Sequence, residues 1–255
     1  MIRVSPYPIP LPGTKPIACT EYNEQALYDD RLPFNASPVS SYSGAEWLPI
    51  PNGRFSLYVA GVPNAGKSYF TAQILKLFPK NYEVLLFSAL DEKDSNFDDI
   101  PQKIWKINIF SEKFNELNLA TIKKLVKNPI CVFDDYDDIP DPKVAKSVLG
   151  LLNEILLKGR AHEKGSSDVH IIITSHFLNN SLKTKGPIEN CDFLCVFPLS
   201  TLQSQMELLL CTKVGISKKD LLELISFCKN NKIRKIIVKK TAPQFIITQN
   251  LIRLL

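Results

Sequence analysis

The chain has 255 residues, of which 45% are hydrophobic and 22% are charged, an ordinary balance for a globular protein. That balance excludes a chain that is disordered throughout, and no run approaches the roughly 18 apolar residues of a membrane span. The first residues lack an apolar core between a basic start and a small-residue cleavage site, so we expect no secretory signal.

The six cysteines are scattered along the chain and include no Cys-x-x-Cys pair. Clustered metal sites need such close pairs, and disulfide frameworks are typical of small secreted chains. We therefore expect reduced, mostly buried thiols in an intracellular protein.

Prolines are concentrated at the start of the chain, where half of the 18 lie within the first 51 residues. Because proline fixes φ and removes a backbone donor, this stretch cannot form long helices or central strands. We interpret residues 1–53 as a Pro-rich extended arm, partly polyproline-like, that could wrap the core or a neighbouring subunit. Residues 54–255 are expected to form a single folded domain.

After the arm, short apolar runs alternate with helical periods. Strands are expected over residues 55–60, 84–89, 104–110, 130–133, 170–174 and 193–197. Helices are expected over residues 67–78, 116–126, 144–157, 202–211 and 218–229. Residues 233–238 and 244–248 are expected to close the domain as a C-terminal β-hairpin. Strands separated by helices predict an α/β fold, in which a mostly parallel sheet has helices on both faces.

The segment Gly61–Ser68 fits the Walker A pattern Gly-x-x-x-x-Gly-Lys-[Ser/Thr], between an expected strand and an expected helix. A loop that wraps a phosphate must turn sharply and aim backbone N–H groups inward, and the helix that follows adds its dipole. We expect Lys67 to reach the β- and γ-phosphates and the Ser68 hydroxyl to ligate Mg²⁺. The residues expected to bind ATP are Gly61, Val62, Pro63, Asn64, Ala65, Gly66, Lys67, Ser68 and Tyr69.

A pair of carboxylates, Asp134 and Asp135, follows the apolar run 130–133 in the manner of a Walker B motif. Burying an acid is costly unless a metal ion or a partner compensates its charge. We expect Asp134 to hold the Mg²⁺ shell, usually through water, and Asp135 to orient and activate the attacking water. An acidic loop is the alternative, because Asp137, Asp138 and Asp141 follow closely.

The apolar run 170–173 ends in Thr174, Ser175 and His176. We expect this strand to lie beside the carboxylate strand and to place a polar sensor near the γ-phosphate, with His176 as the first candidate. A lone histidine is more often structural, so that alternative stays open.

The C-terminal region is basic, since nine Lys or Arg residues stand against two acidic ones between Lys213 and Lys240, a local excess of +7. Such a segment could bind phosphate backbones through counterion release. It could equally be a solvated helix face and a strand edge guarded by lysines.

With these residues in place, the chain resembles the genome-packaging ATPases of large double-stranded DNA viruses and virophages, in the FtsK–HerA superfamily of ring-forming DNA motors. The resemblance covers roughly residues 55–255, with its pieces in the family's order. Beyond the Walker motifs it rests on Gly-Arg-Ala-His from residue 159, Thr-Ser-His from 174, Cys-Val-Phe-Pro from 195 and the tail from 242.

This resemblance implies a RecA/ASCE-like P-loop NTPase fold, with residues 54–255 as the ATPase domain, and a motor that uses Mg²⁺-dependent, DNA-stimulated ATP hydrolysis to package a viral double-stranded DNA genome. It implies a hexameric or similar homo-oligomeric ring with ATP sites at subunit boundaries, where Arg160 is the position that matches the arginine inserted by a neighbour. The implied partners are double-stranded DNA and a capsid or portal component. The implied location is the host cytoplasm, a viral factory or the virion.

The chain departs from the family pattern at several positions. Ala161 interrupts the Gly-Arg-His segment, which puts the role of His162 in doubt. Asp135 stands where many related motors have Glu and is one methylene shorter, so its role as the base stays open. A helix-end arginine such as Arg160 more often caps carbonyls or pairs with an acid, and the Pro-rich arm has no counterpart.

Other enzyme classes share the Walker motifs. An AAA+ remodelling ATPase stays open, although no clear segment matches its helical lid. A small-molecule kinase would need a lid with several arginines, and residues 54–255 hold four: Arg54, Arg160, Arg234 and Arg253. A nucleotide-gated switch with negligible turnover is a further alternative, against which the paired acids argue.

Overall fold

The computed structural model describes residues 54–89, 94–161, 167–178, 183–241, 244–248 and 252–254. The expected N-terminal arm and His162 lie outside this part of the chain. No helix in the described ranges is long and apolar enough to cross a membrane.

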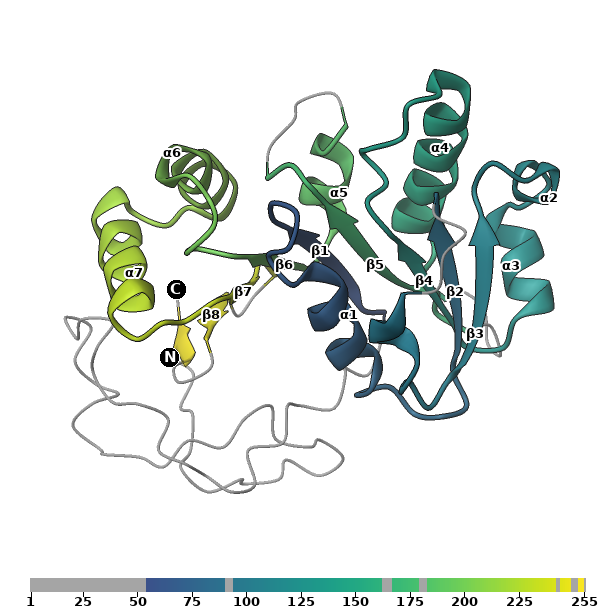
Figure 1. The fold of residues 1–255 in the computed structure, drawn as a ribbon, viewed down its shortest axis with the longest axis horizontal. Coiled ribbons are helices and arrows are strands. Elements are labelled where there is room, and N and C mark those ends of the chain that lie inside the picture. The colour runs from purple at the N-terminus through teal and green to yellow at the C-terminus, as the bar shows by residue number, and fades with distance from the viewer. Residues whose placement is uncertain are drawn as a thin grey trace.

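The described strands form one nine-stranded sheet in the order β3-β2-β4-β5-β1-β6-β7-β8-β9 (Figure 1). The first six strands in that order run parallel: β3 (Lys103–Asn108), β2 (Glu83–Ser88), β4 (Pro129–Phe133), β5 (His170–Ser175), β1 (Ser56–Ala60) and β6 (Phe193–Val196). The last three pair antiparallel: β7 (Ile236–Lys239), β8 (Phe245–Ile247) and β9 (Ile252–Leu254). The expected α/β class, the mostly parallel sheet and the C-terminal hairpin are therefore confirmed.

The central strands are apolar throughout because both faces of the sheet are covered. Along β1, Tyr58 and Ala60 belong to the core on one face, whereas Leu57 and Val59 belong to the core on the other. Every residue of β1, β4 and β5 is buried. This double burial explains why the sequence shows continuous apolar runs in place of alternation.

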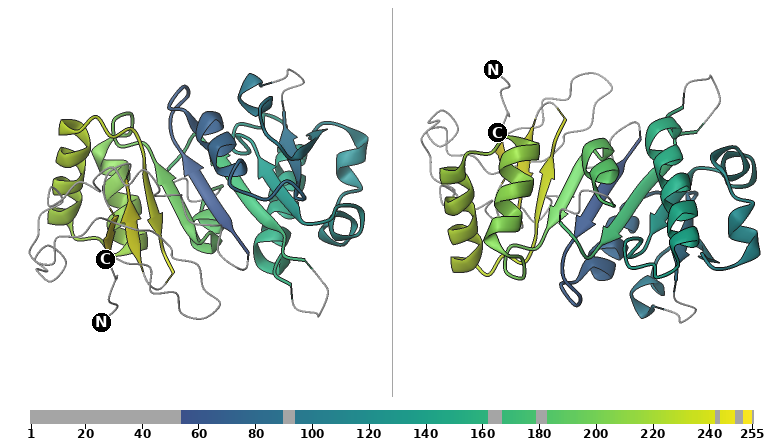
Figure 2. Two further views of the ribbon diagram at one scale, coloured as in Figure 1. Left: turned by 90° about the horizontal axis from the view of Figure 1, so that it is seen from below. Right: turned by 90° about the horizontal axis from the view of Figure 1, so that it is seen from above.

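Helices cover the two faces unequally (Figure 2). One face carries α2 (Glu112–Asn115), α3 (Leu119–Leu125), α4 (Pro142–Lys158), α5 (Lys185–Asn190), α6 (Gln203–Met206), the π-helical η2 (Glu207–Val214) and α7 (Lys218–Asn230). In the described part of the chain, the other face carries α1 (Lys67–Leu75) and the short 3₁₀ turn η1 (Ser95–Phe97).

Two expected helices differ in the structure. The helix expected over residues 116–126 begins later, as α3 at Leu119, because the Asn118 side chain caps α3 by accepting from Thr121 N at 2.9 Å. The short helix α2, which precedes it, was not predicted. The helix expected over 202–211 begins as α6 and widens into η2, which ends at Gly215 with φ of 87°. The short helix α5 and the strand β9 were not predicted.

Side-chain hydrogen bonds satisfy backbone groups at both ends of helix α4. Asp141 caps its N-terminus, accepting from Lys143 N at 2.7 Å. At the other end, the Arg54 guanidinium donates to the carbonyls of Ile155 and Leu156 at 2.9 and 2.8 Å. Burial lowers the pKa of Arg54. Arg54 is thus a structural residue that satisfies free helix carbonyls.

Candidate nucleotide-binding site

The expected phosphate loop connects β1 to α1, and its backbone makes the tight turn that the motif requires. Asn64 and Gly66 both have positive φ, of 63° and 101°, and Gly66 caps the start of α1. Asparagine and glycine tolerate this left-handed region better than other residues. Gly61 N donates to Ser175 O at 3.1 Å, so the loop begins beside the end of β5.

A phenylalanine at the end of β6 fixes the space available to this loop. A Cβ atom added to Gly61 would lie 2.7 Å from Phe197 Cδ2 and 3.2 Å from Ala65 Cβ. Phe197 is itself buried, in the core that α1 covers. Glycine is therefore required at position 61 because an aromatic ring fills the place of any side chain.

Lys67 lies at the first turn of α1 with only 6% of its side chain exposed. Its Nζ donates to Gly61 O at 3.1 Å and lies 3.4 Å from Asp135 Oδ1. His176 Nδ1 is 3.3 Å from the same Nζ. The next two residues are less enclosed, since Ser68 is half-buried and Tyr69 is exposed. The structure thus brings Lys67, Asp135 and His176 together.

The two carboxylates occupy different positions after β4. Asp134 continues the strand, with its N–H donating to Phe87 O of β2 at 2.9 Å. Asp135 has a positive φ of 43°, which turns the chain out of the sheet. Its carboxylate then reaches Lys67 with Oδ1 and His176 Nε2 with Oδ2, the latter at 3.0 Å.

Burial, followed by repulsion from the Asp135 carboxylate, raises the pKa of Asp134 to about 6. The Lys67 charge opposes this rise, but only weakly, and the Asp94 carboxylate adds to it. Because the ionised form of this carboxyl is poorly solvated and repelled by Asp135, a bound cation would stabilise it.

Thr174 and Ser175 end β5, which lies between β4 and β1, and His176 follows them. Their side chains have different partners. The Thr174 hydroxyl accepts from Asp135 N at 2.7 Å and lies 3.0 Å from Asp134 Oδ1. His176 faces Asp135 and Lys67. The Ser175 hydroxyl instead donates to Asp137 Oδ2 at 2.5 Å, away from the two carboxylates. Thr174 and His176 therefore belong to the site, and Ser175 supports it.

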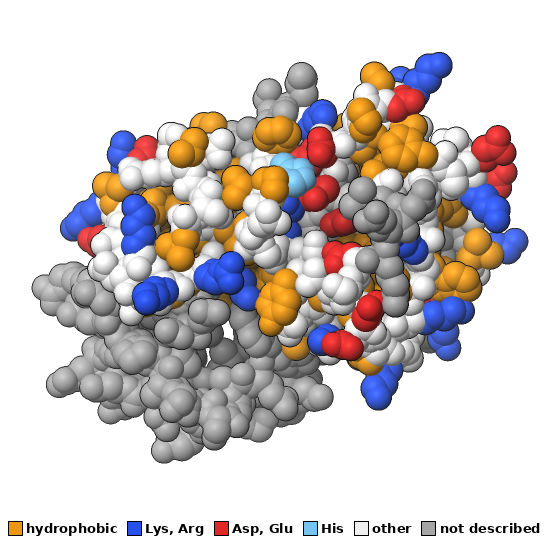
Figure 3. Space-filling model, in the orientation of Figure 1, with side chains coloured by type: hydrophobic (Ala, Val, Ile, Leu, Met, Phe, Trp, Pro, Cys, Tyr) orange, Lys and Arg blue, Asp and Glu red, His pale blue; other side chains and the backbone are white. Residues whose placement is uncertain are grey.

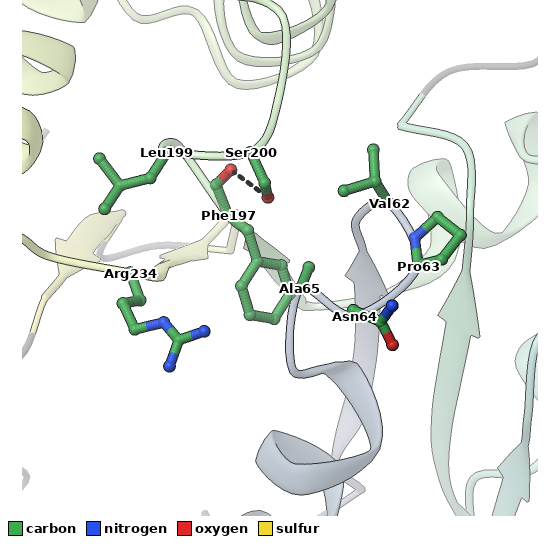
Figure 4. Close-up of a pocket in the computed structure, with 8 residues that line it drawn as sticks. All are labelled: Val62, Pro63, Asn64, Ala65, Phe197, Leu199, Ser200 and Arg234. Atoms are coloured by element: carbon green, nitrogen blue, oxygen red, sulfur yellow. Dashed lines mark hydrogen bonds between the residues drawn. The ribbon is translucent and has the colours of Figure 1, made fainter.

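A pocket of about 150 Å³ lies on the opposite side of the phosphate loop from β5 (Figure 4). The loop forms one wall and the segment after β6 forms the other, while Arg234 comes from the segment just before β7. The lining residues are Val62, Pro63, Asn64, Ala65, Phe197, Leu199, Ser200 and Arg234. The Arg234 side chain is exposed, and Figure 4 shows it across the Phe197 ring from the loop.

The oxygen donors available here suit a Mg²⁺ ion that is shared with substrate phosphates better than a metal ion bound by protein side chains alone. Ser68 and Asp134 offer the hard oxygen donors that Mg²⁺ prefers. Within the described ranges, no three His, Cys, Asp or Glu side chains cluster into a ready-made metal cage. Mg²⁺ is usually held by one or two protein oxygens, substrate phosphates and water, which is what these residues could provide.

Arg160 does not join the site of its own chain. It follows the C-terminal end of α4, where its carbonyl accepts from Lys123 Nζ at 3.4 Å. Because α4 begins just after the carboxylate loop and runs away from it for 17 residues, Arg160 lies near the N-terminal end of β5, whereas the carboxylates lie at the C-terminal end of β4. Its side chain is exposed. A role at an ATP site would therefore require a neighbouring subunit.

Sequence reasoning missed several residues that shape the site. Asp137 was named only as part of the alternative acidic loop, yet it is 2% exposed, whereas its neighbour Asp138 is exposed. Phe197 was noted only within the Cys-Val-Phe-Pro segment of the resemblance, and Arg234 only within the basic segment, so neither was expected to line a pocket.

Comparisons with known proteins give distant similarities. No family model matches the chain. It is 29% identical to the uncharacterized protein V3 of Sputnik virophage over 213 residues, 80% of each chain. The genome packaging NTPase B204 from Sulfolobus turreted icosahedral virus 2, in complex with ATP-gammaS, aligns with 76% of this chain and 96% of its own, at TM-score 0.42 and 11% identity. The pCW3 conjugation coupling protein TcpA aligns with 78% of this chain and 59% of its own, at TM-score 0.41 and 12% identity.

Proposed function

We propose that this protein is a Mg²⁺-dependent ATPase that translocates double-stranded DNA and packages a viral genome. The observation that carries the ATPase part is the mutual contact of Lys67, Asp135 and His176 at 3.0 to 3.4 Å. These side chains come from three separate segments and meet beside a glycine-turned loop at a helix N-terminus, where phosphate groups bind.

Each residue has a role in hydrolysis that follows from its position. The backbone N–H groups of the loop and of α1 bind the phosphates, and Lys67 exchanges part of its contact with Asp135 for the β- and γ-phosphate oxygens. Asp135 is then free to orient a water molecule for in-line attack and to accept its proton. His176 holds Asp135 Oδ2, so that Oδ1 stays directed at the reacting phosphate.

Mg²⁺ would be held by Ser68, Asp134 and the phosphate oxygens, where it supplies positive charge for the transferring phosphate. The Thr174 hydroxyl positions the Asp134 carboxylate through its contact of 3.0 Å with Oδ1. The same hydroxyl accepts from Asp135 N, so one side chain aligns both acids. A Thr174 hydroxyl in this place supports a site organised around two carboxylates with different tasks.

The order of the strands also supports one orientation of ATP relative to the phosphate loop. The carboxylates and His176 extend from β4 and β5, on one side of the phosphate loop. The pocket beside Phe197 and Arg234 adjoins β6 and β7, on the other side. We therefore place the γ-phosphate towards β4 and β5 and the adenosine in this pocket, where Leu199 offers apolar contact and Arg234 offers charge.

The DNA-packaging part of the proposal is supported by the sequence segments beyond the Walker motifs and by similarity to a virophage protein. Its partners would be double-stranded DNA and a capsid or portal component. Its location would be the host cytoplasm, a viral factory or the virion.

Part of the basic segment 213–240 is already engaged within the chain. Lys213 and Lys218 pair with Glu189 and Glu207 at 3.1 and 3.2 Å. Lys240 donates to the Glu189 carbonyl at 3.1 Å. These contacts favour the alternative in which those lysines belong to a solvated protein surface and do not bind DNA. The candidates left for DNA phosphates are the exposed Lys219, Lys229 and Lys232.

Exposed apolar side chains near the site support a neighbouring subunit there. Val62, Phe177, Leu199 and Leu202 are between 41% and 68% exposed. Figure 3 shows apolar side chains gathered on this face around a histidine and several carboxylates. A homo-oligomeric ring would cover such side chains and would bring Arg160 of one subunit towards the ATP site of the next.

The test is steady-state ATP turnover with and without duplex DNA, over a range of protein concentrations. A motor with shared sites should turn over ATP faster with DNA, and its specific activity should rise with protein concentration. Turnover that is linear in protein and indifferent to DNA would retain the ATPase and refute the motor. A small-molecule kinase would instead transfer phosphate to an acceptor, and a switch would bind ATP without turnover.

A further inference from the structure

The two loops that carry the reacting side chains leave the sheet together. The pairing of β4 with β5 ends at Phe133 and Ile173. Beyond that point, among the residues that the structure describes, no ladder of backbone hydrogen bonds holds the Asp135 loop against the His176 loop. Side chains must do so if His176 is to stay within 3.0 Å of Asp135.

The Asp137 carboxylate fills this gap between the loops. It is 2% exposed and accepts from Ser175 Oγ at 2.5 Å, His176 N at 3.1 Å and Phe177 N at 3.2 Å. Its second oxygen lies 3.2 Å from His176 N. Three donors on consecutive residues therefore converge on one buried carboxylate, and such charge-assisted bonds are stronger than neutral ones.

Further hydrogen bonds hold Asp137 and the residues that it contacts in place. Lys183 Nζ donates to the Asp137 carbonyl at 2.6 Å, and Tyr136 Oη donates to Lys183 O at 2.9 Å. Tyr58 Oη, from the middle of β1, donates to Phe177 O at 2.5 Å. Both ends of the Ser175–Phe177 segment are thus attached to a rigid part of the sheet.

We propose that Asp137 is a positioning residue for ATP hydrolysis, which holds the His176 backbone so that the imidazole can orient Asp135. The proposal rests on the proposed function. Asp137 touches neither the phosphate loop nor the two site carboxylates in any described contact. Its loss should therefore affect the chemical step more than ATP binding, since misplacing a catalytic group by about 1 Å can cost on the order of 100-fold in rate.

The first experiment compares Asp137→Asn with Asp138→Asn, which removes the same charge from the exposed neighbouring residue. Asp137→Asn should lower kcat about 10- to 100-fold and change KM for ATP by less than about threefold. Asp138→Asn should retain wild-type values. Ser175→Ala, which removes a single donor, should give a smaller loss of kcat and guards against failure of Asp137→Asn to fold.

A double-mutant cycle with His176→Ala tests whether Asp137 acts through the histidine. If it does, adding Asp137→Asn to His176→Ala should lower kcat by less than about twofold further. Losses that multiply would overturn the proposal. A variant that keeps the wild-type kcat and loses only thermal stability would also overturn it, because Asp137 would then be purely structural.

A measurement without turnover separates this inference from the proposed function. The chain has three histidines, so the imidazole resonances of His176 can be assigned by substitution and followed by ¹⁵N–¹H correlation in the protein without nucleotide. They should move in Asp137→Asn and stay unchanged in Asp138→Asn. If they move while the wild-type protein hydrolyses no ATP, the proposed function fails and the positioning contact stands. If they stay unchanged in both variants, the positioning contact is refuted.

Discussion

Replacing Asp134 with asparagine should stabilise the protein while removing its ability to use Mg²⁺. The Asp134 carboxyl group is partly buried beside Asp135, which raises its pKa from an ordinary value of 3.8 to about 6. The folded protein therefore binds this proton more tightly than the unfolded chain. Stability from this group is present at low pH, decreases as the pH rises from about 4 to about 6, and is absent above that window.

The magnitude follows from the difference between the two pKa values. A difference of about two corresponds to about 3 kcal/mol, at 1.36 kcal/mol for each pKa unit. The asparagine oxygen can still accept from Thr174, but its amide group must find an acceptor, so we expect a net gain of about 2 kcal/mol at pH 7.5. For a domain of this size that gain corresponds to about 4 to 8 °C in Tm.

The assay is urea and thermal unfolding of both proteins from pH 4 to pH 8, with EDTA present to remove divalent cations. Burial lowers the pKa of His170 to about 4, so wild-type stability also falls as the pH drops below about 6.5. That contribution is common to both proteins and cancels in the difference between them. The difference should be about 2 kcal/mol at pH 7.5 and close to zero at pH 4.

Under the proposed function the wild-type protein binds Mg²⁺ and ATP and Asp134→Asn binds them weakly, so adding both ligands should reverse the order of stability. Asp138→Asn serves as the control, since it removes a charge that is exposed. If Asp134→Asn were no more stable than wild type at pH 7.5, or if its gain were the same at every pH, burial of this carboxyl would not be the cause.

Four further outcomes are expected. Lys67→Ala should lower turnover by at least about 10²- to 10³-fold, while Lys76→Ala, an exposed lysine at the end of the same helix, should not; normal turnover in Lys67→Ala would remove the site assignment. Asp135→Asn should retain MgATP in equilibrium binding yet hydrolyse it at least about 100-fold more slowly, and normal hydrolysis would place the base elsewhere. Arg160→Ala should be inactive alone, with activity about 10³-fold or more below wild type, and should recover when mixed with subunits that lack Lys67; no recovery in mixed assemblies would contradict a trans arginine. Arg234→Ala should raise KM for ATP about tenfold with little change in kcat, which steady-state kinetics would check; an unchanged KM would argue against adenosine in the adjoining pocket.

The parts of the site that could be predicted were those in which one short segment carries both the local geometry and the chemistry. The glycines around Lys67 specify a turn and a helix start, and the apolar run before Asp134 specifies a buried strand that ends in acids. The strands and most helices could be predicted for the same reason, because their periodicity is local. The start of α3 at Leu119 was missed because a single capping residue, Asn118, outweighed the helical period that begins at residue 116.

Only the tertiary structure decided which residues meet. Lys67 and His176 are 109 positions apart, and they touch because the order of the sheet places β5 between β1 and β4. Asp137 and Asp138 are indistinguishable as neighbouring acids, yet the turn at Asp135 buries the first beneath the His176 loop and leaves the second in solvent. The sequence by itself determined a glycine turn that opens a helix, a buried strand that ends in two acids and an α/β fold, because these depend on local periodicity and backbone preference. Strand order and loop packing decided the contacts, because they depend on burial energies shared among segments far apart in the chain.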